Sequence, residues 1–297
     1  IMNALINRQR RSDLLFVFSI LIPIMALFTI IRFIPITQTI ITSFYKKSMI
    51  RPGTSFVGLE NYQYVMGDGE FLRSCGNTAF IASLSMVLSV VIGLFLASEV
   101  NREVVHGMKV YQALFFLPVI VSMVPSTLMW KMIFDYNFGV INYIIEALGW
   151  RSVDWINNEK IVRWPIIIVS FWKEMGYNMM IFYVGLKSIS KELYESADLD
   201  GANAWRQFRS ITIPQLKPIT LFVLVISLIK FVKVFTQAIV MTSGSQSSGN
   251  IMKTIVYYIY QQGFSLHSMG RASAASVILL LAVFLLTWLQ MNISKER

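Results

Sequence analysis

The sequence contains few of the residues on which disulfide-rich, metal-binding and soluble proteins depend. Among its 297 residues there is one cysteine, Cys75, and there are two histidines, His106 and His267. These numbers exclude a disulfide framework and a closed zinc site. Charged residues make up only 14% of the chain, whereas 55% of the residues are hydrophobic. A soluble domain of this composition would leave too much apolar surface in water, so the composition indicates a membrane protein.

Proline and glycine are also scarce, at 8 and 16 residues. Together with the lack of any low-complexity segment, this excludes disordered and collagen-like chains. Basic residues outnumber acidic ones: the chain has 26 Lys and Arg and 16 Asp and Glu, which gives a formal net charge of +10. In a soluble protein such an excess would suggest a nucleic-acid partner. Here the cations lie between apolar runs, which indicates a membrane surface and no nucleic acid.

Long apolar runs are what the sequence has in abundance. A membrane-spanning helix needs roughly 20 apolar residues, each adding about 1.5 Å. Six runs have this character: Leu14–Phe33, Thr78–Val100, Val110–Phe134, Pro165–Leu186, Ile219–Val240 and Ala272–Met291. The first is too long for a signal peptide and no small-residue cleavage pattern follows it, so it is interpreted as a retained helix. The sequence therefore predicts an all-α membrane protein with six transmembrane helices.

The distribution of positive charge predicts the orientation of these spans. Twelve Lys and Arg lie in the connections on the side of the N-terminus, against nine in the alternate connections, which are longer. Because positive charge is retained in the cytoplasm, both termini are predicted to be cytoplasmic. The predicted regions are a cytoplasmic N-terminal arm (1–13), a first transmembrane helix (14–43), an extracytoplasmic loop (44–77), a core transmembrane domain (78–291) and a cytoplasmic tail (292–297).

The polar connection between the fourth and fifth spans, residues 187–218, is patterned. Ser190 can cap a helix, and Asp200 with Gly201 indicates where that helix ends and the chain restarts. A second helix is predicted over Ala202–Ile211, with aromatic and arginine side chains on different faces. Two prolines then break this helix and redirect the chain into the fifth span. On pattern alone, the alternative is an amphipathic hairpin lying on the membrane surface.

Ten residues of this connection, spread over 24 positions, follow a specific spacing. They are Glu195, Ser196, Ala197, Asp200, Gly201, Ala202, Phe208, Ile211, Pro214 and Pro218. This spacing resembles the EAA loop of the permease subunits of binding-protein-dependent ABC importers, EAAxxDGAxxxxxFxxIxxPxxxP. Serine in the second position is the one departure, and it replaces one small residue with another. Residues 56–62, 139–142 and Gly270 also resemble the carbohydrate-uptake branch, so the resemblance covers nearly the whole chain.

One outer loop, Ser243–Asn250, departs from that branch, because Ser and Gln stand where a Gly-Gly-Pro element is common. The departure leaves the shape of this loop open. The same segment has glycines at the spacing of a phosphate-binding loop, but it lacks the required Lys and Ser or Thr and follows no strand. It is interpreted as a chance match. Since no Ser-His-Asp set and no paired carboxylates are visible either, no catalytic residue and no metal site are predicted.

The resemblance implies a type I ABC importer permease fold with a cytoplasmic coupling-helix hairpin. It implies that this hairpin docks on a separate ATPase, and that Trp205 and Phe208 anchor its second helix to the chain's own spans. The implied partners are a second homologous permease subunit in a heterodimer, two ATPase subunits, which bind ATP and Mg, and an extracytoplasmic solute-binding protein that delivers a sugar-like solute. This chain itself is expected to bind no cofactor. The expected ATPase-coupling residues are Glu195, Ser196, Ala197, Asp200, Gly201, Ala202, Arg206 and Phe208.

Ionisable residues within the predicted spans indicate a translocation path, because charge is costly in the membrane. Three lysines and one glutamate lie inside the fourth and fifth spans, so two positive charges are left over. These favour an acidic saccharide or a phosphorylated polyol as the solute, with two aromatic rings as stacking surfaces. The alternatives are pairing with a second permease subunit and snorkelling to water, which is also expected for Lys131 and Arg32. The predicted path residues are Lys173, Glu174, Tyr177, Lys230, Lys233 and Phe235.

Three other functions remain open from the sequence. A secondary transporter driven by an ion gradient would need no coupling hairpin, but would show broken, ion-coordinating helices. A membrane-embedded enzyme would need a catalytic constellation, which is missing. A scaffold would recruit the ATPase to the membrane and move nothing.

Overall fold

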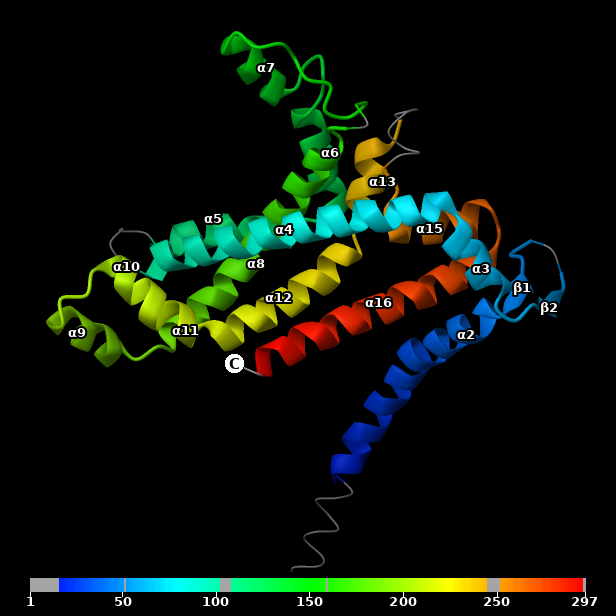
Figure 1. Ribbon diagram of the computed structural model, residues 1–297, viewed down its shortest axis with the longest axis horizontal. Coiled ribbons are helices and arrows are strands. Elements are labelled where there is room, and N and C mark those ends of the chain that lie inside the picture. The colour runs from blue at the N-terminus through cyan, green and yellow to red at the C-terminus, as the bar shows by residue number, and fades with distance from the viewer. Residues whose placement is uncertain (1–15, 51, 102–107, 159, 245–251, 296–297) are drawn as a thin grey trace, which may run out of the picture. The chain divides into compact units, whose positions relative to one another are not determined.

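Helices make up most of the chain in the computed structural model, which describes residues 16–50, 52–101, 108–158, 160–244 and 252–295 (Figure 1). The predicted N-terminal arm, the phosphate-loop look-alike beyond Gly244, His106 and the end of the predicted tail lie outside the described residues. The chain forms two compact units, one of residues 1–67 with 261–278 and one of residues 68–260 with 279–297.

The first unit starts with a long helix and continues into a small hairpin. Its elements are the helix Phe16–Ser43, which includes η1 (Thr29–Phe33) and α2 (Ile34–Ser43), then β1 (Tyr45–Lys47), β2 (Thr54–Phe56), α3 (Glu60–Gly67), η3 (Gln261–Ser265) and the start of α16 (Met269–Lys295). The two strands pair antiparallel, with Tyr45 opposite Phe56. The buried side chain of Asn61 donates to Ser43 O at 2.8 Å and to Tyr45 O at 3.0 Å, which ties α3 to the turn after α2.

The second unit is built around two long helices, α4 (Gly69–Asn101) and α8 (Arg163–Lys187), which pack against each other, with α12 (Lys217–Val232) in contact with both (Figure 1). Shorter helices surround them. These are α5 (Met108–Ile120), α6 (Met123–Ile133), α7 (Val140–Ala147), α9 (Lys191–Leu199), α10 (Ala204–Gln207), η2 (Phe208–Thr212), α11 (Ile213–Gln215), α13 (Thr236–Thr242) and α15 (Ile255–Tyr260).

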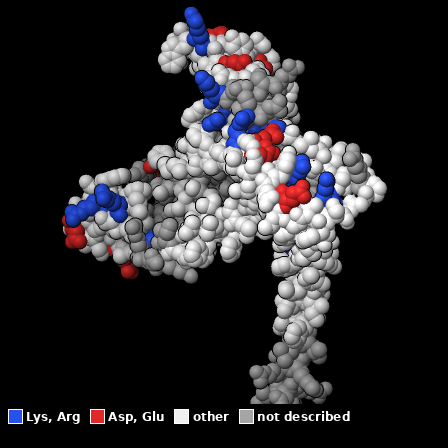
Figure 2. Space-filling view, turned by 45° about the vertical axis from the view of Figure 1, so that its right-hand side comes forward, with Lys and Arg blue, Asp and Glu red and all other residues white. Residues whose placement is uncertain are grey.

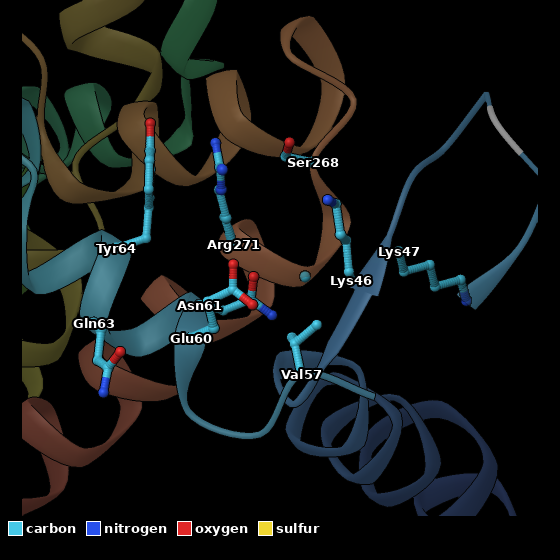
Figure 3. Close-up of a pocket in the computed structure, with 10 residues that line it drawn as sticks. Lys46, Lys47, Val57, Glu60, Asn61, Gln63, Tyr64, Ser268 and Arg271 are labelled. Atoms are coloured by element: carbon cyan, nitrogen blue, oxygen red, sulfur yellow. The ribbon is translucent and has the colours of Figure 1, made fainter. Parts of the chain in front are cut away.

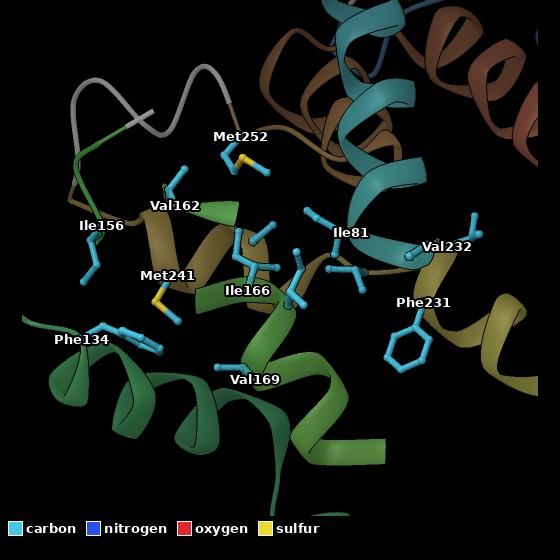
Figure 4. Packing of buried hydrophobic residues seen from close by; sticks show 14 residues of the cluster. Ile81, Phe134, Ile156, Val162, Ile166, Val169, Phe231, Val232, Met241 and Met252 are labelled. Atoms are coloured by element: carbon cyan, nitrogen blue, oxygen red, sulfur yellow. The ribbon is translucent and has the colours of Figure 1, made fainter. Parts of the chain in front are cut away.

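Two clusters of buried apolar side chains hold the second unit together. One joins α4, α6, α8, α12 and α13 through residues such as Ile81, Phe134, Ile166 and Phe231 (Figure 4). The other joins α4, α8 and α12 and includes the fully buried Phe182. Lipid tails are as apolar as these side chains, so close van der Waals packing holds such helices together in a bilayer, in place of the hydrophobic effect.

Among the residues that the structure describes, three helices are long and apolar enough to cross a membrane: Phe16–Ser43, Gly69–Asn101 and Met269–Asn292. Two further pairs of helices are each bent at a short break, and the number of candidate spans rises to five if each bent pair is counted as one span. These are Val110–Ile120 with Met123–Ile133, bent by 101°, and Ala204–Gln215 with Lys217–Val232, bent by 66°. The helix α8 is not among them. The all-α fold is confirmed, while the count of six spans stays a prediction.

The helix ends differ from the prediction in three places. The second long helix begins at Gly69, so the predicted loop 44–77 holds two strands, α3 and the start of α4. The third apolar run, predicted as one span, is broken between Ile120 and Met123. The fifth run is broken between Val232 and Thr236. A break in a membrane helix leaves backbone carbonyl groups without their helical N–H donors. Donors from elsewhere in the chain must therefore bind these carbonyls at each break.

Asn142, on α7, is the centre of a hydrogen-bond network that shapes the segment 135–155. Its side chain is 3% exposed. It donates to Tyr136 O at 3.2 Å and to Val153 O at 2.9 Å, and it accepts from Val153 N and Trp155 Nε1, each at 3.1 Å. This network explains the presence of a buried amide side chain in a mostly apolar helix.

Replacing Asn142 with Leu should destabilise the chain by about 2–4 kcal/mol, because several buried donors and acceptors lose their partner. A lower melting temperature and faster amide exchange at Val153 would report this loss. The exposed Asn137 provides the control, since Asn137→Leu should leave both measurements close to those of the unmodified protein. Equal stability of the two variants would contradict the assigned role of Asn142.

Candidate functional site

The predicted coupling hairpin is present, and its first helix is α9. Ser190 caps this helix, because its side chain accepts a hydrogen bond from Glu192 N. At the other end Gly201 has a φ of +72°. Ala202 N donates to Ala197 O at 2.9 Å, and Gly201 N donates to Asp198 O at 3.0 Å. These two bonds form a Schellman helix end, which requires a left-handed residue at the position of Gly201.

The second helix of the hairpin is longer than predicted. It begins at Ala204, with Asn203 as its cap, and runs through α10, η2 and α11 to Gln215. The expectation that the helix ends before Pro214 is wrong. A proline removes one helical hydrogen bond and crowds the preceding turn. The π-helical turn η2 lies just before Pro214 and widens the helix there, and the 66° change of direction follows after Gln215.

Side-chain hydrogen bonds join the two arms of the hairpin. Gln207 Nε2 donates to Asp198 Oδ1 and, at 3.1 Å, to Ala202 O. Further along, the hydroxyl groups of Tyr194 and Thr212 lie 2.8 Å apart and share a hydrogen bond. The residue spacing alone did not identify these contacts, because they join positions on two different helices. They make the hairpin one stiff element.

The outer surface of the hairpin is both charged and apolar. Figure 2 shows Lys, Arg, Asp and Glu side chains gathered over it. Leu199, at the tip, is 91% exposed, and Trp205 is 69% exposed and stacked on Phe208 with ring centroids 6.0 Å apart. Trp205 therefore does not anchor the hairpin to the chain's own spans as expected. Of the expected coupling residues, the exposed ones are Glu195, Ser196, Asp200, Gly201 and Arg206, and the half-buried ones are Ala197, Ala202 and Phe208.

Within the helices of the second unit, Glu174 on α8 faces Lys230 on α12. Their carboxylate and ammonium groups lie 2.6 Å apart, and the Lys230 ammonium also lies 3.9 Å from the centroid of the Tyr177 ring. Beside this pair is a cavity of about 300 Å³ that reaches the break between α12 and α13. It is lined by Met123, Ser170, Glu174, Lys230, Phe231, Lys233, Val234, Phe235, Thr236 and Gln237.

Five of the six predicted path residues thus lie in or beside one cavity. Glu174, Lys230, Lys233 and Phe235 line it, and Tyr177 packs on Lys230. Lys233 is exposed and forms no ion pair with any described residue. The cavity therefore carries a net positive charge, because Glu174 compensates only one lysine.

Lys173 lies elsewhere. Its side chain is buried, and its ammonium group donates to Pro118 O and Val121 O at the break between α5 and α6. Lys131 has a similar role at the end of α13, where it donates to Val240 O at 3.3 Å and to Ser243 Oγ at 3.1 Å. The expectation that Lys131 snorkels to water is not met, because backbone carbonyls take up its hydrogen bonds. Among the described residues, no three His, Cys, Asp or Glu side chains form a group that could hold a metal ion.

With the fold and the hairpin established, the chain can be compared with known proteins. Residues 89–296 match the family described as the binding-protein-dependent transport system inner membrane component. The chain belongs to this family. It is a permease component of an ABC importer, as the spacing of residues 195–218 predicts.

Relatives of this permease match it over most of their length. It is 32% identical over 274 residues to the arabinooligosaccharides transport system permease protein AraP of Bacillus subtilis, covering 92% of this chain and 86% of the relative. It is 31% identical over 245 residues to the sn-glycerol-3-phosphate transport system permease protein UgpA of Yersinia pestis, covering 82% of each. It also resembles the trehalose/maltose transport system permease protein MalF of Thermococcus litoralis, at 26% identity over 99% of both chains.

A solved structure shares the fold of this permease. It is a chain of the crystal structure of a bacterial ABC transporter involved in the import of the acidic polysaccharide alginate. The TM-score is 0.83 at 24% identity, over 97% of this chain and 96% of that one. The predicted type I importer permease fold is thereby confirmed.

Proposed function

We propose that this permease moves a sugar-like solute, such as an oligosaccharide, across the cytoplasmic membrane by alternating access. The observation that carries the proposal is the stiff hairpin between Ser190 and Thr212, whose residue spacing is that of the family's EAA loop. The names of the relatives AraP, MalF and UgpA, which refer to sugars and a glycerol phosphate, support this class of solute. Alternating access needs a driving force that favours one state over the other, and a separate ATPase supplies it through the hairpin.

The proposed complex contains this chain, a second homologous permease, two ATPase subunits and an extracytoplasmic solute-binding protein. ATP and Mg bind to the ATPase subunits, while this chain binds no cofactor. Both termini and the hairpin lie in the cytoplasm. The exposed Leu199 and Trp205 provide apolar contact area for the ATPase, and Glu195 and Asp200 offer carboxylates to its cationic side chains.

Transport by the complex in proteoliposomes tests this function. Import should require ATP and the solute-binding protein, and it should continue when an ionophore dissipates ion gradients. Import that needs a gradient and no ATP would show a secondary transporter instead. Binding of the ATPase without import of any solute would show a scaffold.

We further propose that the cavity beside Glu174 and Lys230 lies on the translocation path and favours an acidic solute. Lys233 provides the uncompensated positive charge, and the rings of Tyr177 and Phe235 provide flat apolar surfaces for a sugar. Glu174 gives Lys230 an ion-pair partner inside the membrane when no solute is bound. Lys173 has its own carbonyl partners, so in this proposal it supports the helix break next to the path.

Replacing Lys233 with Gln should raise the KM for an acidic saccharide at least about tenfold, because a charge-assisted contact of about 1.5–3 kcal/mol is lost. The KM for a neutral saccharide should change little. Lys217→Gln is the matched control, since Lys217 is an exposed lysine at the start of the same helix. Unchanged import of the acidic saccharide by Lys233→Gln and by Lys230→Gln would remove the proposed preference.

A further inference from the structure

A second cavity, also of about 300 Å³, lies entirely within the first unit (Figure 3). Its walls come from β1, α3 and the first turn of α16. They include three cations: the side chains of Lys46 and Arg271 extend toward the same side in Figure 3, while the side chain of Lys47 points away from them. Glu60 is the acidic residue of the lining. None of the residues proposed for coupling or translocation takes part in this cavity.

The walls of this cavity are packed tightly enough to hold their shape. Gly270 is buried, and a Cβ atom there would lie 2.1 Å from Tyr45 O and 2.8 Å from Asn61 Nδ2. Only glycine lets the start of α16 approach β1 and α3 so closely. The Arg271 guanidinium lies 3.5 Å from the centroid of the Tyr64 ring. This contact holds the guanidinium in place and leaves its N–H groups free to bind an oxyanion.

The described part of the chain offers no ion-pair partner to the two cations that point the same way in this cavity. Neither Lys46 nor Arg271 forms an ion pair with a described residue, although Glu60 lines the same cavity. When Lys47 is set aside because its side chain points away, Lys46 and Arg271 against Glu60 leave one positive charge. The cavity therefore suits a singly charged anion that also offers hydroxyl groups to Glu60.

The position of the cavity indicates where such an anion comes from. The candidate span Phe16–Ser43 ends two residues before Tyr45, and the candidate span Met269–Asn292 begins where Gly270 and Arg271 line the wall. Span ends lie at the level of the lipid headgroups. Chain neighbours of the lining residues expose apolar side chains, namely Met49, Ile50, Phe56, Leu59 and Leu266. A cationic pocket with apolar neighbours at this level fits a phospholipid better than an acidic loop of a soluble protein, because acyl chains cover the apolar side chains.

We propose that this cavity binds the phosphodiester of an anionic phospholipid, of which phosphatidylglycerol is the simplest. Arg271 and Lys46 contact the phosphate oxygens, and Glu60 accepts hydrogen bonds from the glycerol hydroxyl groups. The acyl chains lie along the exposed apolar side chains. The proposal does not depend on which solute the permease transports.

Native mass spectrometry of the full chain in its importer tests this site, after reconstitution in nanodiscs that contain phosphatidylglycerol diluted in phosphatidylcholine. The unmodified protein should retain phosphatidylglycerol in preference to phosphatidylcholine. Arg271→Gln and Lys46→Gln should each reduce retention of phosphatidylglycerol at least about tenfold. Lys47→Gln is the matched control, because it removes the same charge from a lining side chain that points away from Lys46 and Arg271, and it should retain the lipid.

Lys46 is exposed, so Lys46→Gln keeps the test informative even if Arg271→Gln disturbs the contact with Tyr64. Equal retention of phosphatidylglycerol and phosphatidylcholine by the unmodified protein would overturn the proposal. So would a loss of phosphatidylglycerol in the Lys47→Gln control equal to that in the Arg271→Gln and Lys46→Gln variants. Displacement of the lipid by inorganic phosphate would identify a site for free phosphate instead. If Arg271→Gln and Lys46→Gln instead bind the solute-binding protein more weakly and retain the lipid unchanged, the cavity is a contact site for that protein. This result would also overturn the proposal.

Discussion

Replacing Gly201 with Val is expected to reduce ATP-driven import at least about tenfold. Gly201 has a φ of +72°, and a β-branched residue is strained in this region by about 1–2 kcal/mol or more. The strain acts on the Schellman end of α9, so the hairpin would lose the defined angle between its two arms. Apart from its two chain neighbours, no atom of the described residues lies within 4 Å of a Cβ atom built at Gly201, so the effect does not come from a clash with them. Import by proteoliposomes, together with ATPase activity of the complex, measures this loss of coupling.

Gly201→Asn is the informative comparison. Asparagine tolerates the left-handed conformation, so the Asn variant should keep the end of α9 and most of the import. Equal loss in the Val and Asn variants would show instead that the surface beside Gly201 must stay empty for the ATPase. Normal import by the Val variant would contradict the role of the hairpin in coupling.

Replacing Lys173 with Met is expected to destabilise the permease by about 2–5 kcal/mol, since two carbonyl groups in the membrane lose their donor. Pro118 O and Val121 O lie at the 101° break between α5 and α6, so this break should open or rearrange. A lower melting temperature of the purified complex and reduced import of every solute, acidic or neutral, are the expected results. Lys160→Met is the control, because Lys160 is exposed outside the long helices.

The Lys173→Met variant also distinguishes a role of Lys173 at the helix break from a role on the translocation path. Loss of stability with every solute affected would support its role at the helix break. Normal stability with a raised KM for acidic solutes alone would place Lys173 on the translocation path, as the sequence first suggested.

The hairpin could be predicted closely because its signals are local. A serine cap, an Asp-Gly end and the spacing of residues 195–218 all act within a few residues of the structure that they determine. The contacts between its arms, such as Asp198 with Gln207, could not be predicted, because they depend on how the chain folds back after Gly201.

The helix breaks were missed for a physical reason. A hydropathy window reads Val110–Phe134 as one span, and the apolar run continues through the break at Ile120. Pro118 was the local signal available, because it removes one hydrogen bond inside α5. The partner that makes the break tolerable is Lys173, 55 residues from Pro118 in sequence, and no local pattern connects the two. The expected surplus of two positive charges on the path was too large for the same reason, since it did not allow for the backbone carbonyls that bind Lys173.

Lys131, which binds the end of α13, has a consequence for how the protein is made. Synthesis proceeds from the N-terminus, so Lys173 emerges after the carbonyl groups that it binds, whereas Lys131 emerges 109 residues before Val240. Until then Lys131, in the last turn of α6, has none of these partners, and a lysine in an inserting helix costs up to about 2.5–3.5 kcal/mol at the helix centre and less toward its end. Nascent chains that stop short of α13 should therefore hold α6 poorly in the bilayer, and its stable integration should wait for the ribosome to pass residue 243.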